Sequence, residues 1–175
     1  MSVKIWSGIG ARKTPIELHP FVTEVADLFA RSGWTMRSGG ADGFDSWCEA
    51  ATPPEQREVH LPWRGYNDNP SPLFGVDDQA LALAETMHPA WSRCSLHARK
   101  LHARNCYEIL GRELIAPSRV VITWTSRGEL VGGTATALRL ASLHEVETIN
   151  LGAPWMTLKR AWFLVLQIIA EGSTS

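Results

Sequence analysis

Three glycine-rich segments of the chain are suited to holding an anion. They are Ser7-Gly8-Ile9-Gly10, Ser38-Gly39-Gly40-Ala41-Asp42-Gly43 and Gly132-Gly133-Thr134. Glycine lets a ligand approach the backbone closely. Where such a turn opens a helix, its free N–H groups and the positive end of the helix dipole attract negative charge. The chemistry that these residues predict is the binding of a phosphate group.

The same segments exclude several familiar kinds of site. The first turn reads GxGxxK, which lacks the third glycine of the dinucleotide fingerprint, and the chain contains no GxxxxGK[ST] loop. It also contains no GxSxG motif of the kind that carries a nucleophilic serine. We therefore expect no NAD, no ATP hydrolysis, no serine-hydrolase chemistry and no resident cofactor.

Short apolar runs alternate along the chain with segments of helical periodicity, which positions the three turns. The expected strands lie at 3–6, 34–36, 58–61, 120–124 and 148–151, and the expected helices at about 18–29, 44–51, 95–110, 134–143 and 156–170. This alternation predicts an α/β fold, a Rossmann-like three-layer sandwich with a mostly parallel sheet of about five strands. In a 3-2-1-4-5 strand order the first and fourth strands flank the ligand crevice, where the turns converge.

Length and composition predict one domain over residues 1–175, with a proline-containing loop insertion at about 62–94 and an apolar terminal helix at about 156–170. The net charge of -1 indicates no general nucleic-acid or membrane surface. Three cysteines without a CxxC pair, no targeting segment and no apolar run of membrane-spanning length favour a cytoplasmic protein that has no membrane partner.

The ordered set of motifs resembles the SLOG superfamily, which includes DNA-processing protein A, the LONELY GUY phosphoribohydrolases and YpsA-like nucleotide-binding proteins. The residues that carry the resemblance are Ser7 to Arg12, Ser38 to Asp45, Arg104-Asn105 and Gly132 to Thr134. It implies a nucleotide or nucleotide-derived ligand, whose phosphate lies on the glycine turns, and a homo-oligomer. The ligand-binding residues expected on this basis are Gly8, Gly10, Arg12, Ser38, Gly39, Gly40, Asp42, Trp63, Arg99, Arg104, Asn105, Gly132, Gly133 and Thr134.

Within that set, Arg12 and Arg104 are expected to clamp the phosphate, and Arg99-Lys100 resembles a basic segment of the phosphoribohydrolases. Those enzymes carry a glutamate shortly after the PGGxGT turn, and this chain has no carboxylate at that place. Asp45, Glu49 or Glu129 could replace it, whereas an aspartate at a helix start, such as Asp42 or Asp45, also serves as a cap. Binding therefore stands ahead of N-glycosidic hydrolysis, which stays an alternative.

Two further interpretations concern the segment that precedes the fourth strand. The basic helix from His97 to Arg104, together with the tryptophans, would suit single-stranded DNA, and Trp63 would either stack on a base or pack internally. His88, Cys94, His97, His102 and Cys106 lie close together in the sequence. Their spacing matches no standard zinc pattern, and i,i+5 positions do not share a helix face, so no metal site is expected.

Overall fold

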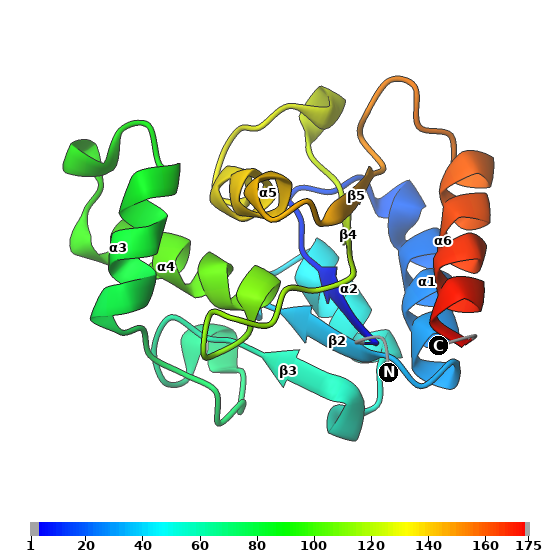
Figure 1. Cartoon of the computed structure of the whole chain (residues 1–175), viewed down its shortest axis with the longest axis horizontal. Coiled ribbons are helices and arrows are strands. Elements are labelled where there is room, and N and C mark those ends of the chain that lie inside the picture. Colours follow the sequence, from blue (N-terminus) through cyan, green and yellow to red (C-terminus); the bar gives the residue numbers. More distant parts are fainter. Residues whose placement is uncertain (1–3, 174–175) are drawn as a thin grey trace.

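The computed structural model describes residues 4–173, and its elements alternate as the sequence predicts (Figure 1). The strands are β1 (Ile5–Gly8), β2 (Thr35–Ser38), β3 (Arg57–Val59), β4 (Val120–Thr123) and β5 (Glu147–Asn150). The helices are α1 (His19–Arg31), α2 (Phe44–Ala51), α3 (Asp78–Met87), α4 (Leu96–Leu110), α5 (Thr134–Leu143) and α6 (Leu158–Ser173).

The five strands form one parallel sheet in the order β3-β2-β1-β4-β5. The predicted α/β, Rossmann-like fold is thereby confirmed, and the strand order is the 3-2-1-4-5 order in which the first and fourth strands flank the ligand crevice. Backbone pairing between the first and fourth strands continues past the sheet, because Ala11 N–H donates to Trp124 O at 3.1 Å. The order in which the strands are added reverses between β1 and β4, and open α/β sheets bind ligands at such a point.

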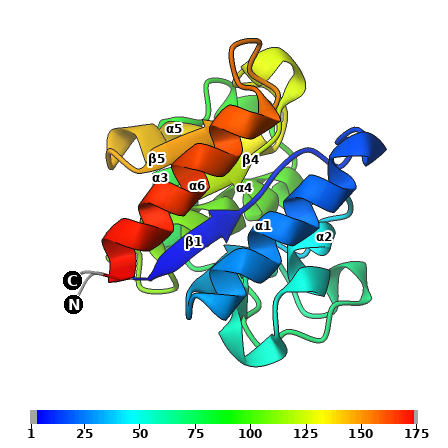
Figure 2. The same cartoon turned by 90° about the vertical axis from the view of Figure 1, so that its right-hand side faces the viewer.

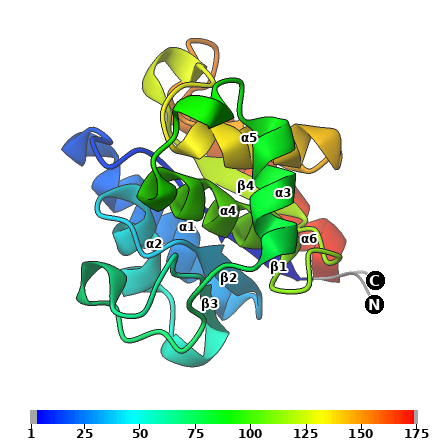
Figure 3. The same cartoon turned by 90° about the vertical axis from the view of Figure 1, so that its left-hand side faces the viewer.

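Side chains alternate across the sheet and build one apolar core on each face. In β4, Val120 and Ile122 join the core formed with α1, α2 and α6, whereas Val121 joins the core formed with α4 and α5. Figure 2 shows α1, α2 and α6 together, and Figure 3 shows α3, α4 and α5 on the opposite side. The buried tryptophans Trp6 and Trp34 both lie in the first core.

The insertion at 62–94 contains a helix, α3, which the expectation of a loop did not include. Asp77 caps this helix by accepting a hydrogen bond from Ala80 N–H at 2.8 Å, and Ala80 and Ala84 are fully buried against α4. The prolines of the segment lie before and after the helix and obscure its short alanine-rich pattern. Helix α3 therefore packs as an additional layer outside α4 (Figure 3).

The terminal helix α6 is amphipathic. Ala161, Val165 and Ile168 are buried, whereas Phe163 and Leu166 on its outer face are exposed. Across residues 4–173, no helix combines the length and the apolar character that crossing a bilayer requires.

Candidate functional site

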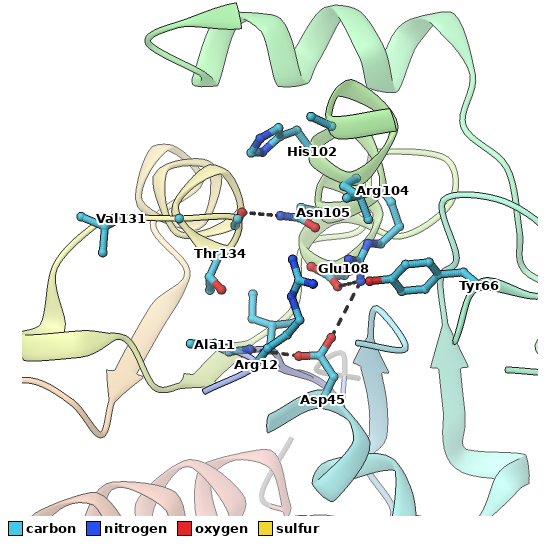
Figure 4. Close-up of a pocket in the computed structure, with 16 residues that line it drawn as sticks. Ala11, Arg12, Asp45, Tyr66, His102, Arg104, Asn105, Glu108, Val131 and Thr134 are labelled. Carbon is cyan, nitrogen blue, oxygen red and sulfur yellow. Dashed lines mark hydrogen bonds and ion pairs between the residues drawn. The ribbon is translucent and has the colours of Figure 1, made fainter. Parts of the chain in front are cut away.

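A pocket of about 330 Å³ opens at the carboxyl ends of β1 and β4, the place that the strand order predicts (Figure 4). Its walls come from the turn after β1, the start of α2, a short 3-10 helix at Tyr66–Asp68, the α4 helix, and the turn that opens α5. The lining residues are Ile9, Gly10, Ala11, Arg12, Asp45, Tyr66, Ala98, Leu101, His102, Arg104, Asn105, Glu108, Val131, Gly132, Gly133 and Thr134.

One wall is the N-terminus of α5. Gly133 is the N-cap of this helix, and within residues 4–173 no side-chain hydrogen bond caps it. Gly132 has a φ of +70°, a backbone conformation that glycine adopts without strain. Asn105 Nδ2 donates to Gly133 O at 2.7 Å, so α4 holds the turn from the side. Ala135 N–H donates to Gly132 O at 3.4 Å, and the remaining N–H groups of this helix N-terminus are available to an anion.

Arg12 reaches into the pocket from the turn after β1, and Figure 4 shows its guanidinium between Asp45 and Asn105. It is exposed, and it forms no hydrogen bond or ion pair with any residue in the range 4–173. The backbone that carries it lies close to Gly43, where an added Cβ would come within 2.5 Å of Arg12 O. Glycine at 43, with a φ of +81°, is therefore needed to bring α2 against the Arg12 turn.

Arg104 is not free in the same way, because it is buried between two carboxylates. Its Nη1 atom lies 2.7 Å from Glu108 Oε1, one helical turn away, and 3.8 Å from Asp45 Oδ2. The three side chains are at most 7% exposed. The sequence predicts Arg104 as a phosphate clamp, whereas the guanidinium in the structure mainly neutralises buried protein carboxylates.

Asp45 links the first two glycine turns. Its Oδ1 atom accepts from Gly10 N–H at 3.0 Å, and its Oδ2 atom accepts from Gly39 N–H at 3.1 Å. A Cβ at Gly39 would overlap the side chains of Arg104 and Glu108, so this position must lack one. The two backbone amides already donate to a protein carboxylate, and Asp45 takes the place that an anionic ligand would have on them.

Glu49 accepts hydrogen bonds from the second glycine turn in a similar manner. Its Oε1 atom accepts from Ser38 Oγ at 2.6 Å and from Gly40 N–H at 3.1 Å, and its Oε2 atom accepts from Asn69 Nδ2 at 3.0 Å. Three hydrogen bonds of this kind fix the turn to α2 and to the insertion. The second glycine turn therefore supports the pocket wall from within, and the third turn presents its amides to solvent.

Burial changes the protonation of the carboxyl groups around Arg104. Loss of hydration raises the pKa of Asp45 to about 6 and the pKa of Glu108 to about 8, although the nearby Arg104 cation lowers both. Burial also raises the pKa of Glu49. One guanidinium pairs with two buried carboxyl groups, Asp45 and Glu108, so the cluster retains a proton near neutral pH.

The pocket brings together many of the residues expected from the sequence. Gly10, Arg12, Asp45, Arg104, Asn105, Gly132, Gly133 and Thr134 all line it. Other expected residues lie outside the lining: Gly8, Ser38, Gly39, Gly40, Asp42, Glu49, Trp63, Arg99 and Glu129. Among these, Glu129 pairs with Arg127 at 3.1 Å, and Trp63 packs edge-on against Tyr66 and His97.

Among the lining residues that were not expected from the sequence, three carry side chains that can form hydrogen bonds: Tyr66, His102 and Glu108. The sequence could have indicated Glu108 as a site residue, because it follows Arg104 by four residues, the spacing at which helical side chains pair. No sequence pattern indicates Tyr66 as a lining residue, because its position depends on how the insertion folds over β2.

Comparisons with known proteins add a likeness of fold. No protein-family model matches the chain, and a search of curated proteins found no significant match. The structure resembles that of DNA processing protein A from Helicobacter pylori, with a TM-score of 0.57 and 16% sequence identity over 98% of this chain and 81% of that one. That protein is described as binding single-stranded DNA. The likeness extends over nearly the whole chain and shows a shared α/β architecture.

Proposed function

We propose that the protein binds a nucleotide-type ligand in the pocket between β1 and β4. The observation that carries the proposal is the meeting of two anion-binding groups in one pocket: the unpaired guanidinium of Arg12 and the uncapped N-terminus of α5. Arginine provides a planar fork that fits phosphate oxygens, and a helix N-terminus adds backbone donors. These two groups would offset most of the charge of a phosphate that contacts both, without disturbing the buried carboxylates.

The rest of the pocket suits the remainder of such a ligand. Its volume of about 330 Å³ lies at the lower end of the range for small-molecule sites. Figure 4 places Tyr66 on the side of the pocket opposite Thr134, and the Arg104 guanidinium lies 5.8 Å from the centre of the Tyr66 ring. With its phosphate at Thr134 and Arg12, a nucleotide would extend its base toward this held aromatic ring.

Replacing Arg12 with glutamine is expected to weaken binding of nucleoside monophosphates by about 10- to 100-fold, the loss of one charge-assisted hydrogen-bonding group. Isothermal titration calorimetry with the four common monophosphates measures this change. Lys13→Gln is the matched control, because Lys13 is the adjacent exposed cation and does not line the pocket. Its affinity for monophosphates should stay within about twofold of the original protein.

Equal losses in the two variants would show that general surface charge, and not the pocket, attracts the ligand. Nucleosides without a phosphate should bind far more weakly than monophosphates. Free base in the same mixtures would show that the ligand is also cleaved, and Asp45 and Glu108 are the carboxyl groups in the pocket that could supply acid-base chemistry. A protein that binds neither monophosphates nor inorganic phosphate would overturn the proposal.

A second candidate function is the binding of single-stranded DNA, favoured by the fold similarity to DNA processing protein A. A strand would place one backbone phosphate at Arg12 and the next along the exposed surface that includes Lys13. Buried Arg104 would not contribute, contrary to the expectation from the basic α4 sequence.

For this candidate, oligonucleotide affinity is expected to fall steeply as salt increases, and Lys13→Gln should reduce the slope of log K against log[salt] by about 0.7. Fluorescence anisotropy over a salt series measures the slope. Lys13→Gln thus separates the two candidates, because it weakens oligonucleotide binding and leaves mononucleotide binding unchanged. A slope that the substitution does not alter would count against a strand passing this surface.

A further inference from the structure

Three metal-ligating side chains converge on the side of α4 that faces the insertion. His88 follows the last residue of α3, Cys94 follows a short 3-10 helix at Trp91–Arg93, and His102 lies in α4. One ligand atom from each lies within 4.8 Å of the others, and Cys94 Sγ is 3.7 Å from His88 Nδ1. A tetrahedral zinc ion with ordinary bond lengths separates its nitrogen and sulfur ligands by about 3.3–3.8 Å. Small side-chain rotations would therefore complete the geometry.

We propose that His88, Cys94 and His102 bind one Zn²⁺ ion. Two imidazoles and a thiolate are donors that suit zinc and exclude Mg²⁺ and Ca²⁺, which prefer oxygen ligands. Three protein ligands leave a fourth position for water, and the half-buried His88 and Cys94 leave that position a route to solvent. On binding, the Cys94 thiol transfers its proton to solvent and its sulfur forms the bond to the metal.

A hydrogen bond already orients one of the ligands, and a second has a lone pair on the nitrogen that would bind the ion. Thr136 Oγ1 lies 2.8 Å from His102 Nδ1, which leaves Nε2 of that buried ring for the ion. Ala90 N–H donates to His88 Nδ1 at 3.2 Å, so this nitrogen carries the lone pair that ligation requires, and the ion would replace a long hydrogen bond. Hydrogen bonds to the distal nitrogen of a histidine are typical of metal sites, where they fix the ring.

The remaining candidates from the sequence do not join the cluster. His97 packs against Trp63, with ring centres 5.4 Å apart, and Cys106 is buried with its thiol directed to His102 O. The spacing argument against a metal site considers residues within α4, whereas two of the three ligands come from the insertion. Zinc would therefore tie the end of the insertion to α4.

Because the inference uses neither Arg12 nor the α5 turn, it does not depend on the proposed function.

Titrating Co²⁺ into the full chain, prepared free of metal with a chelator, tests the site. We expect saturation at one ion per chain, a thiolate-to-cobalt charge-transfer absorption band, and loss of that band when Zn²⁺ is added. Mg²⁺ should produce no change. Zinc should also raise the melting temperature, since an ion that binds only the folded chain stabilises it.

Variants assign the ligands. Cys94→Ser should abolish the charge-transfer band and weaken zinc binding by about 100-fold or more, and Thr136→Val should weaken it by about 10-fold. His97→Ala is the matched control, because His97 is exposed, lies one or two turns from His102 on α4, and should leave binding unchanged. Circular dichroism checks that each variant is folded, and His88→Ala provides a second ligand removal. Absence of the charge-transfer band, or a band that survives Cys94→Ser, would overturn the proposal.

Discussion

Replacing Arg104 with methionine is expected to lower the free energy of unfolding by about 3–5 kcal/mol at pH 8, the cost of removing one partner from a buried ion pair. Methionine keeps most of the apolar stem of the side chain, so the loss reports the charge. Without the guanidinium, the carboxyl groups of Asp45 and Glu108 remain buried without a cationic partner between them. Urea unfolding followed by circular dichroism measures the change.

Arg31→Met is a matched control for burial. Arg31 pairs with Asp27 at 2.8 Å across one turn of α1, the same i,i+4 spacing at nearly the same distance as Arg104 and Glu108. The side chains of that pair are 66% and 52% exposed, and such surface pairs contribute about 0.3–0.5 kcal/mol. The two ion pairs have the same sequence spacing and nearly the same distance. Arg104→Met should nevertheless lower the free energy of unfolding several-fold more than Arg31→Met does.

Acid should reduce the effect of the Arg104 substitution. At pH 5 the carboxyl groups of Asp45 and Glu108 take up protons, because burial has raised the pKa of each, and a neutral carboxyl group no longer needs the cation. The destabilisation by Arg104→Met should thus be smaller at pH 5 than at pH 8. A loss as small as that of Arg31→Met at pH 8 would show that the cluster does not depend on its cation.

The fold follows largely from local features of the sequence. Val120–Thr123 is a short apolar segment between a proline-containing turn and a glycine-containing turn, which marks a buried parallel strand. Phe44–Ala51 begins directly after Gly43, and the sequence predicts its bounds as the structure has them. Alternation of such segments leaves few topologies, because crossovers between parallel strands are right-handed.

The part of the pocket that could be predicted lies at the ends of strands. Gly10, Arg12 and Gly132–Thr134 follow β1 and β4, and the carboxyl ends of parallel strands meet at one edge of a sheet. Their convergence therefore needs only the topology. The sequence pattern could not show whether the amides of a glycine turn meet a ligand or a protein carboxylate such as Asp45, because that depends on side-chain packing.

The burial of Arg104 is the clearest example of a feature that spacing in the sequence could not predict. Its partner Asp45 lies in α2, and a strand, the insertion and half of α4 separate the two residues in the chain. The partners of His102 likewise come from the insertion, whose fold has little periodic signal. In each case the decisive contact joins segments that the tertiary structure alone brings together.

Glu108→Gln is expected to remove the pH dependence of stability between about pH 7 and 8.5. Burial raises the pKa of Glu108 from 4.5 to about 8 in the folded chain. Between these values the unfolded chain has lost a proton that the folded chain keeps, so stability falls as the pH rises, by about 1.4 kcal/mol per pH unit for one proton. Glutamine stays neutral and can still accept a hydrogen bond from Arg104.

Among the other shifted groups, Asp45, His60 and His102 titrate below this window, and the raised pKa values of Cys48 and Cys106 affect stability only as the pH approaches 9. The folded pKa of Asp45 is about 6, so its contribution is lost by pH 7. Burial lowers the pKa of His60 and lowers that of His102 to about 4, and their contributions are gained as the pH rises to about 6.5 and stay constant above it. Chemical denaturation at pH 7.0, 7.5, 8.0 and 8.5 should give a falling curve for the original protein and a level one for Glu108→Gln.

Glu58→Gln is the control of opposite sign. The neighbouring His60 and Arg37 lower the pKa of Glu58 to about 2. Its stabilising effect is therefore present above pH 4.5 and is lost as the pH falls toward 2. Glu58→Gln should reduce stability yet keep the slope between pH 7 and 8.5. A level curve in the original protein would contradict the raised pKa of Glu108.

The proton on Glu108 also links stability to the proposed ligand, because Glu108 lines the same pocket as Arg12. A phosphate monoester is a dianion throughout pH 7 to 8.5, since its second pKa is about 6. Any weakening of its binding over this range then arises from the protein, as Glu108 loses its proton and adds a negative charge to the pocket. Affinity for monophosphates should fall with rising pH in the original protein and stay constant in Glu108→Gln. A parallel fall in both would place the titrating group elsewhere, even if the stability curves differ as expected.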